Sequence, residues 1–251
     1  MFEVAADAYD RLMGRYSGPL ASGFADFAGI VAGTRVLEVG CGTGALTAEL
    51  ARCVGADALA AVEPSESFVS AARARHPGVD IRRASAEELP FPDDGFDAAL
   101  AQLVVHFMSD PEAGVREMAR VTREGGTVAA CVWDRGGGRG PLSRFWEAVR
   151  ELDPEHAGEP RAMGSNEGDL HALFERAGLR EVEETLLSAD VGHASFDEWW
   201  EPYTRGAGPP GVYVAGLDPD RREALREHCR AAFPDDGLTL TVAAWAARGR
   251  V

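Results

Sequence analysis

A chain of 251 residues with 45% hydrophobic and 26% charged residues has ordinary globular composition and can bury one sizeable core. We therefore expect one α/β domain with a modest insertion, not two independent domains. The net charge of −16 disfavours binding to nucleic acids and membranes, because phosphate backbones and anionic lipids are bound chiefly through Lys and Arg.

The N-terminal residues, MFEVAADAYDRLMG, carry acids where a secretory signal peptide needs basic residues. No apolar run approaches the roughly 18 residues that a membrane-spanning helix requires. The cysteines show neither CxxC pairing nor a Cys/His ligand spacing; they are Cys41, Cys53, Cys131 and Cys229. These features favour a cytoplasmic protein without a disulfide framework or a metal site.

An amphipathic helix is expected over residues 19–31, where apolar residues recur at helical spacing, and we assign 1–33 to an N-terminal helical segment. From Thr34 onwards, strands and helices alternate, which predicts parallel strands. The expected strands are 35–39, 58–62, 80–84, 96–102 and 127–133, and the expected helices are 44–54, 65–75 and 111–122. Residues 34–133 thus form the expected core.

The glycine-rich stretch RGGGRGP ends regular structure at Asp134 and opens the last segment, 134–251. We expect its loop, 136–140, to be mobile until substrate binds. Further helical stretches are 167–177, 195–203 and 218–232, with strand-like stretches at 179–189 and 238–247. The whole pattern predicts a Rossmann-like, seven-stranded, mostly parallel sheet with helices on both faces, a cap insertion and a closing antiparallel pair.

The motif EVGCGTG, which begins at Glu38, joins the first strand to its helix. Glycines there serve a tight turn or let a ligand approach the backbone. Gly40, Gly42 and Ala45 satisfy a relaxed dinucleotide fingerprint, and Glu63 follows about 20 residues later, so the spacing leaves NAD or FAD open. Glu38 opposes a pyrophosphate but suits an ammonium and a sulfonium, which favours S-adenosylmethionine (SAM).

Four blocks in order carry a family resemblance: VLEVGCGTGALTAEL at 36–50, AVEPS at 61–65, SAEELPFPDDGFDAAL at 85–100 and REMARVTREGG at 116–126. The chain resembles the small-molecule class I SAM-dependent methyltransferases related to quinone-biosynthesis enzymes. The likeness is strong over about 34–133 and weak beyond it, where substrate specificity would be encoded. It implies SAM as cofactor and a small-molecule acceptor, with O-, N- or C-methylation left open.

The resemblance implies a cofactor site built from Glu38, Gly40, Gly42, Gly44, Glu63, Pro64 and Ser65. The glycines would pass under the methionine and ribose, and Glu38 would lie near the amino-acid end. The two oxygens of Glu63 suit the two ribose hydroxyls. The alternative for Glu63 is a charge at the N-terminus of the next helix.

At the third block, the family usually has an Asp that recognises the adenine amino group, whereas this chain has Ser85. Ser85 still accepts a hydrogen bond, and Ala86 offers its backbone N–H. Glu87 either compensates for the missing carboxylate or is solvated. This departure puts tight adenine recognition in doubt.

Residues from Gln102 to His106 follow the fourth strand, where the family places groups beside the transferable methyl. The backbone near Gln102 would hold the methionine ammonium. His106 is our candidate catalytic base, although a lone His in an apolar stretch is often a packing residue. His193 and the acids of the cap are the rival bases.

Tyr9, Arg15 and Tyr16 would close over SAM, with Arg15 offering a fork to its carboxylate, or else simply pack and solvate a helix. The cap aromatics, Trp199, Trp200 and Tyr203, either line the acceptor pocket or anchor their helix.

Two other functions remain open: an NAD-dependent oxidoreductase, and a non-catalytic, SAM-binding regulatory protein that kept the fold. Glu38 and the LPF and EGG blocks disfavour the first. No sequence pattern that we recognise indicates the oligomeric state, the pathway or the acceptor.

Overall fold

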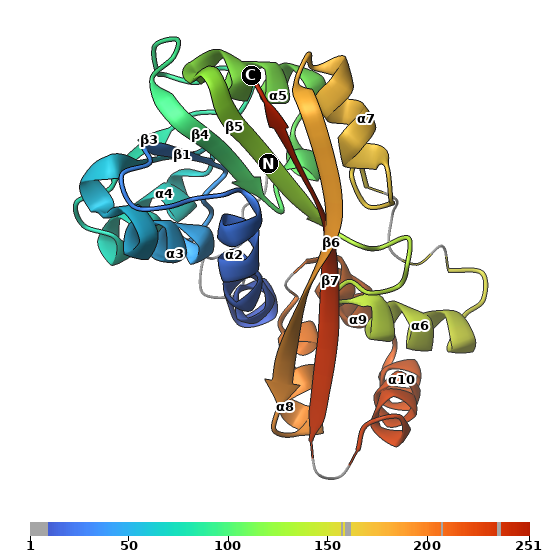
Figure 1. Ribbon diagram of the computed structural model, residues 1–251. Helices are drawn as coiled ribbons and strands as arrows, with labels where there is room; N and C mark the ends of the chain where they lie inside the picture. Colours follow the sequence, from blue (N-terminus) through green and yellow to red (C-terminus); the bar gives the residue numbers. More distant parts are fainter. Residues whose placement is uncertain (1–9, 157, 159–161, 207, 235–236) are drawn as a thin grey trace.

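The computed structural model describes residues 10–156, 158, 162–206, 208–234 and 237–251, so Tyr9 lies outside it. One seven-stranded sheet has the order β3-β2-β1-β4-β5-β7-β6 (Figure 1). The five parallel strands are β1 (Val36–Val39), β2 (Leu59–Glu63), β3 (Asp80–Arg83), β4 (Phe96–Gln102) and β5 (Thr122–Trp133). The antiparallel pair is β6 (Arg180–His193) and β7 (Leu238–Arg250), which confirms the predicted mostly parallel, Rossmann-like sheet.

Helices cover both faces of this sheet (Figure 1). Apolar contacts place α2 (Arg15–Phe27) and α3 (Ala45–Val54) on one face, together with α4 (Glu66–Arg75). The opposite face packs against α5 (Pro111–Val121) and α7 (Asp169–Arg176). Burial on both faces explains the apolar runs of the central parallel strands, such as Leu59 to Val62 in fully buried β2.

Helix α2 occupies 15–27, not the expected 19–31. It continues a π-helical turn, η1 (Asp10–Gly14), and its last turn is followed by Gly29 with φ of 75°. A left-handed backbone at this point suits glycine and ends the helix. The short 3-10 helices are η2 (Ala56–Ala58), η3 (Val105–Phe107) and η4 (Glu201–Arg205).

The antiparallel pair of β6 and β7 extends beyond the end of the neighbouring strand β5. β5 pairs with β7 only from Trp133, opposite Ala244, to Thr127, opposite Arg250, whereas β6 pairs with β7 as far as His193, opposite Leu238. Around the protruding half gather α6 (Ser143–Leu152), α8 (Phe196–Trp200), α9 (Gly208–Gly216) and α10 (Pro219–Ala231), as Figure 1 shows. We call these helices and the protruding half of the β6–β7 pair the cap. Helices α6 and α9 were not predicted.

The glycine-rich loop after β5 is anchored by one buried carboxylate. Asp134 is 1% exposed and accepts hydrogen bonds from the Gly137 backbone N–H at 2.9 Å, Arg139 Nε at 2.5 Å and Trp245 Nε1 at 3.2 Å. These hydrogen bonds tie the loop to Asp134. The ordering of 136–140 on substrate binding stays a prediction.

Within the described ranges, no helix combines the length and apolar character needed to cross a bilayer. Residues 134–251 supply β6, β7 and α7 to the common sheet as well as the cap. The division of the chain at 33 and 133 stays a prediction.

Candidate functional site

The turn between β1 and α3 requires glycine for two different reasons. Gly40, Gly42 and Gly44 have φ of 74°, 54° and 100°, in the region that favours glycine. A Cβ on Gly40 would lie 2.5 Å from Val104 Cγ1, and one on Gly44 would lie 2.3 Å from His76 Nε2. A Cβ on Gly42 would meet no protein atom within 4 Å. Packing thus demands the outer glycines, and Gly42 alone presents bare backbone to open space.

The carboxylate of Glu63 is fixed beside this turn. It accepts hydrogen bonds from the Gly42 N–H through Oε2 and from the Ser65 N–H through Oε1, each at 3.0 Å. Burial raises its pKa. Each oxygen still has a lone pair for a ligand hydroxyl. Because Ser65 is the N-cap of α4, the bond to Ser65 also gives Glu63 the helix-terminal role considered above.

Glu38 is a buried acid, 2% exposed, behind the same turn. Its Oε2 accepts a 2.6 Å hydrogen bond from Thr47 Oγ1. Burial raises the pKa of Glu38 to about 7, against the opposing effect of the Thr47 bond, and the nearby Glu63 adds to the rise. A carboxyl with that pKa is only partly ionised at neutral pH, so it repels a pyrophosphate less than its sequence suggests. A ligand cation would restore the charge.

Two buried side-chain atoms without a hydrogen-bond partner among the described residues lie at the end of β4 and just after it. Gln102 Nε2 donates to the Ser17 carbonyl at 3.1 Å, and its buried Oε1 has no hydrogen-bond partner among the described residues. Leu103 follows with φ of 62°, a strained value for a non-glycine residue and of a kind that concentrates at functional sites. In η3, Nδ1 of His106 likewise has no partner within the described chain.

His106 is uncharged at neutral pH, because burial and, to a smaller extent, the Arg135 guanidinium lower its pKa to about 3. A neutral ring with a free Nδ1 can accept or orient a proton, depending on its tautomer. As a base, it is weak, because general bases work best with a pKa near the operating pH.

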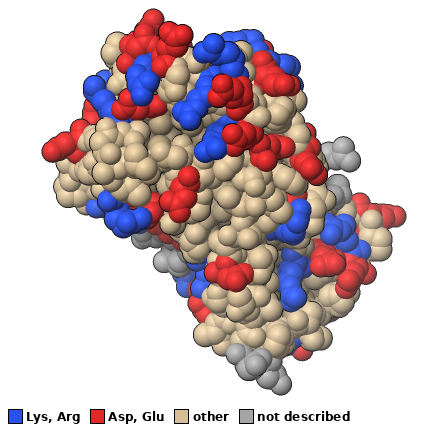
Figure 2. Space-filling model, in the orientation of Figure 1, with Lys and Arg blue, Asp and Glu red and all other residues tan. Residues whose placement is uncertain are grey.

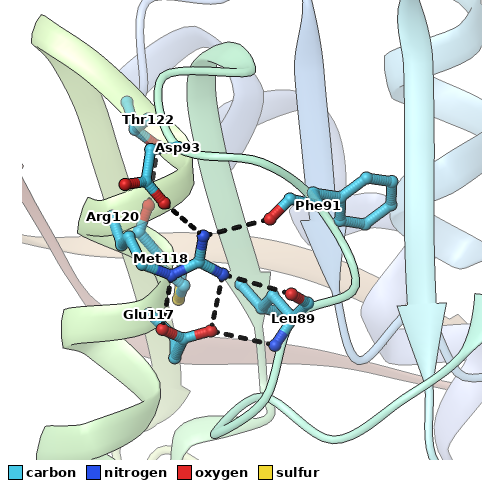
Figure 3. Close-up of polar contacts among 7 residues, drawn as sticks. All are labelled: Leu89, Phe91, Asp93, Glu117, Met118, Arg120 and Thr122. Carbon is cyan, nitrogen blue, oxygen red and sulfur yellow. Dashed lines mark hydrogen bonds and ion pairs between the residues drawn. The ribbon is translucent and has the colours of Figure 1, made fainter.

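The segment after β3 is held by α5 (Figure 3). Arg120 donates to the carbonyls of Leu89 at 3.1 Å and Phe91 at 3.0 Å, and its guanidinium also binds Asp93 and Glu117. The LPFPDD and REMAR blocks are therefore the two halves of one structural clamp. It fixes the chain that follows the predicted adenine residues.

Ahead of that clamp, Ser85 is exposed and Ala86 is buried. Glu87 is not simply solvated, because its Oε1 accepts from the backbone N–H groups of Ser109 at 2.8 Å and Asp110 at 3.2 Å. Pro64, which lies nearer the ribose residue, accepts from Arg83 Nε at 3.1 Å through its carbonyl. The adenine role of Ser85, Ala86 and Glu87 stays a prediction.

Arg15 and Tyr16 bind the cap. Arg15 contacts His193 Nδ1 at 3.0 Å through Nη1 and the Glu198 carboxylate through Nη2, while Tyr16 Oη lies 3.0 Å from His193 Nε2. An arginine only donates, so Nδ1 accepts and Nε2 carries the proton that it donates to Tyr16. Both terminal nitrogens of Arg15 thus contact the cap, whereas its buried Nε has no hydrogen-bond partner among the described residues. The role predicted for Arg15 at the SAM carboxylate stays a prediction.

This network also includes His193, the rival base, whose role stays a prediction. Both ring nitrogens of His193 are engaged, and burial together with Arg15 lowers its pKa to about 4. The cap aromatics behave as packing residues: Trp199, Trp200 and Tyr203 are at most 5% exposed. Tyr203 packs on Phe145 with ring centroids 4.7 Å apart. The anchoring interpretation holds for them, although Trp199 also lines a cavity described below.

Sequence patterns did not reveal three polar residues around the turn. Thr47 binds Glu38, as described, and Asp10 binds the Thr43 hydroxyl and forms a 2.6 Å ion pair with Arg75. Arg75 Nη1 also donates to the Thr43 carbonyl at 3.1 Å. These contacts tie the start of η1 over the glycine turn. Of these three residues, only Thr47 lies close to the glycine motif in sequence, on the helix that follows it, so only Thr47 could have been found from the local sequence.

The comparisons with known proteins address the family directly. The profile of a methyltransferase domain matches residues 37–130. A probable S-adenosylmethionine-dependent methyltransferase of Mycolicibacterium smegmatis is 33% identical over 182 residues, which cover 68% of each chain. The chain belongs to the SAM-dependent methyltransferases. The ubiquinone/menaquinone biosynthesis C-methyltransferase of Vibrio campbellii is 35% identical to this methyltransferase over 179 residues, again 68% of each chain.

A solved structure supports the fold of the methyltransferase. A putative methyltransferase from an antibiotic biosynthesis pathway of Anabaena variabilis superposes with a TM-score of 0.61 at 20% identity, covering 92% of this chain and 96% of that one. The enzyme class and SAM as cofactor follow from the relatives. These matches lend no support to the NAD-dependent alternative.

Glu63 gives a first prediction. Glu63→Ala is expected to weaken binding of S-adenosylhomocysteine by about 1 to 3 kcal/mol, because charged hydrogen bonds to the ribose are lost. Calorimetry with the 2′,3′-dideoxy analogue distinguishes this from loosening of the turn, since the variant should no longer prefer the hydroxylated ligand. Glu66→Ala, an exposed acid on α4, is the matched control. An unchanged preference in the variant removes Glu63 from the ribose site.

Proposed function

We propose that this methyltransferase transfers the methyl group of SAM to a small-molecule acceptor. The observation that carries the proposal is the bare backbone of Gly42, which faces open space beside the carboxyl groups of Glu38 and Glu63. The residues present fit the cofactor: Glu63 for the ribose, Glu38 and Gln102 Oε1 for the ammonium, and Ser85 with Ala86 for the adenine. Pro64, Ser65 and Glu87 would shape the same wall.

SAM supplies an activated methyl on a sulfonium when it binds. The chain's own task is then to bind and orient the cofactor, align the acceptor and exclude water. Gln102 is suited to orientation, because its amide is fixed by the Ser17 carbonyl while Oε1 stays available. His106 is the candidate base that would take up the proton released by the acceptor molecule.

Charge and similarity favour a small acceptor in the cytoplasm over a nucleic acid or a membrane. The quinone-type names of some relatives suggest a small organic acceptor for this chain as well. On the face shown in Figure 2, basic side chains stand beside acidic ones instead of forming a continuous basic surface. With a net charge of −16, this arrangement gives a phosphate backbone little to bind.

Calorimetry with SAM, S-adenosylhomocysteine and NAD tests the cofactor, and a screen of small acceptors with methyl-labelled SAM tests transfer. We expect the first two ligands to bind and NAD not to bind. A non-catalytic, SAM-binding regulator would bind SAM but label no acceptor in a screen that includes phenols, amines and carboxylates. Tight NAD binding without SAM binding would contradict the proposal.

His106→Ala is expected to lower kcat by about a hundredfold on a hydroxyl acceptor, the lower end for a general base, because the pKa of the ring is so low. SAM affinity should hardly change. The loss should shrink at high pH, where a phenol ionises unaided. His171→Ala, at a half-buried histidine on α7 that pairs with Glu175, is the control. Full activity of His106→Ala at neutral pH would remove this residue from the mechanism.

A further inference from the structure

A cavity of about 200 Å³ lies in the cap, between α6 and α10. Its α6 wall carries Arg144, Glu147, Ala148 and Glu151, one face of that helix. None of its lining residues belongs to the cofactor site proposed above. For comparison, an apolar cavity of about 150 Å³ can hold benzene. The space therefore suits a single ring with a short substituent.

Polar bridges span the two helices on either side of this space. His228 Nε2 lies 2.6 Å from Glu151 Oε2, and Arg144 Nη1 donates to the Ala232 carbonyl at 3.4 Å. Because each bridge joins α6 to α10, the helices are held apart by paired groups. The cavity is thus a built feature of the cap.

Two aromatic rings and a neutral thiol form the inner wall. Trp199 is 4% exposed, and its ring centroid lies 6.2 Å from that of Phe233. Cys229 is buried, and burial raises its pKa to about 12, so the thiol is uncharged. Leu238 and Ala148 complete an apolar interior. An aromatic wall of this kind attracts both a ring and a cation.

The charges at the mouth favour a cation. Glu147 is exposed and forms no ion pair within the described part of the chain, and Glu151 adds a second carboxylate. Arg144 is the one guanidinium in the described lining, and one of its nitrogens already binds the Ala232 carbonyl. The net charge of the whole chain, −16, adds to the attraction.

We propose that the cavity between α6 and α10 is a second binding site, for a small aromatic amine. The ring packs against the cavity wall that Trp199 and Phe233 form together, and the ammonium binds Glu147 at the mouth. The site is independent of the methyl-transfer proposal and of the cofactor site. Its occupant meets α8, the helix whose Glu198 holds Arg15, through the adjacent Trp199.

Phenethylamine tests the site by ligand-observed NMR on protein saturated with S-adenosylhomocysteine. We expect it to bind at least about tenfold more tightly than 3-phenylpropionate, which has the same ring and opposite charge. Glu147→Gln should weaken the amine about threefold to fivefold, the usual scale for an exposed ion pair. Glu124→Gln, which makes the same charge change at an exposed position on β5, should not.

Ala148→Phe fills the cavity from α6 and should abolish amine binding while S-adenosylhomocysteine still binds. Should that variant fail to fold, the exposed Glu147 variant decides alone. Equal binding of amine and acid, equal effects of the Glu147 and Glu124 variants, or failure of the amine to bind the protein saturated with S-adenosylhomocysteine would each overturn the proposal.

Discussion

Gly42→Val is expected to weaken SAM binding by at least about a hundredfold and to leave the chain folded. The added side chain would occupy the open space that faces this residue, where the cofactor must approach the backbone. No protein atom lies within 4 Å of its Cβ, so the substitution creates no clash inside the protein. The expected loss is therefore a loss of ligand space.

Backbone strain is the competing cause, because Gly42 has φ of 54°. Gly29→Val controls for it: Gly29 has φ of 75°, and its Cβ would also meet no atom within 4 Å. Calorimetry should show normal SAM affinity for the Gly29 variant, and circular dichroism should show similar melting for both. Affinity within a few-fold of wild type in folded Gly42→Val would contradict the assignment of this turn.

The parallel centre of the sheet could be predicted from the sequence because β1, β2 and β4 are largely buried and consist mainly of apolar residues. Strand β4 has the predicted bounds, 96–102, and the helix predicted from 111 begins there, where Asp110 caps it by accepting from the backbone N–H groups of Glu112 and Ala113. Such signals are local. These local signals predict the structure correctly because the packing of the core favours the same elements.

The cap helices were harder to predict. Helix α6 has apolar residues at helical spacing, including Phe145 and Val149, but it follows a glycine run that is typical of loops. Helix α9, GPPGVYVAG, has the composition of a turn. Each helix is stabilised by packing around the β6–β7 pair. No local sequence pattern indicates this long-range packing.

Long-range polar pairing limited the prediction of the site. Arg15, which we expect either to bind a ligand carboxylate or to pack and solvate its helix, contacts His193, which lies 178 positions away in sequence. The pKa of Glu38 depends on burial and on Thr47, so its charge could not be read from residue type. The glycine motif needed no such partners, because its backbone conformation is encoded by glycine itself.

Glu38 leads to the second large effect, a pH-dependent SAM affinity. Its raised pKa, about 7, means that the empty site keeps a proton that a ligand ammonium must displace. SAM affinity should therefore rise with pH from about 5.5 to 7, by at most about tenfold per pH unit, and then level off. Above about pH 8 the ligand's own amine loses its charge, so the useful window ends there.

The same raised pKa fixes the sign of the stability change. Between the ordinary value of 4.5 and about 7, the folded state binds more protons at Glu38 than the unfolded state does. The free energy of unfolding of the ligand-free protein should thus fall as pH rises through that interval. Glu38→Gln should remove this dependence, which chemical denaturation at several pH values can measure.

Glu38→Gln should also weaken SAM binding at pH 7.5 by about tenfold to a hundredfold, the range for loss of a charged hydrogen bond. Calorimetry across the pH window should show that its affinity no longer rises with pH. Thr47→Val is the informative companion, because loss of the 2.6 Å bond that lowers the pKa of Glu38 should move the rise in affinity to higher pH. If the Gln variant kept the wild-type slope, another group would control the titration, and Glu38 would not be the residue that meets the ammonium.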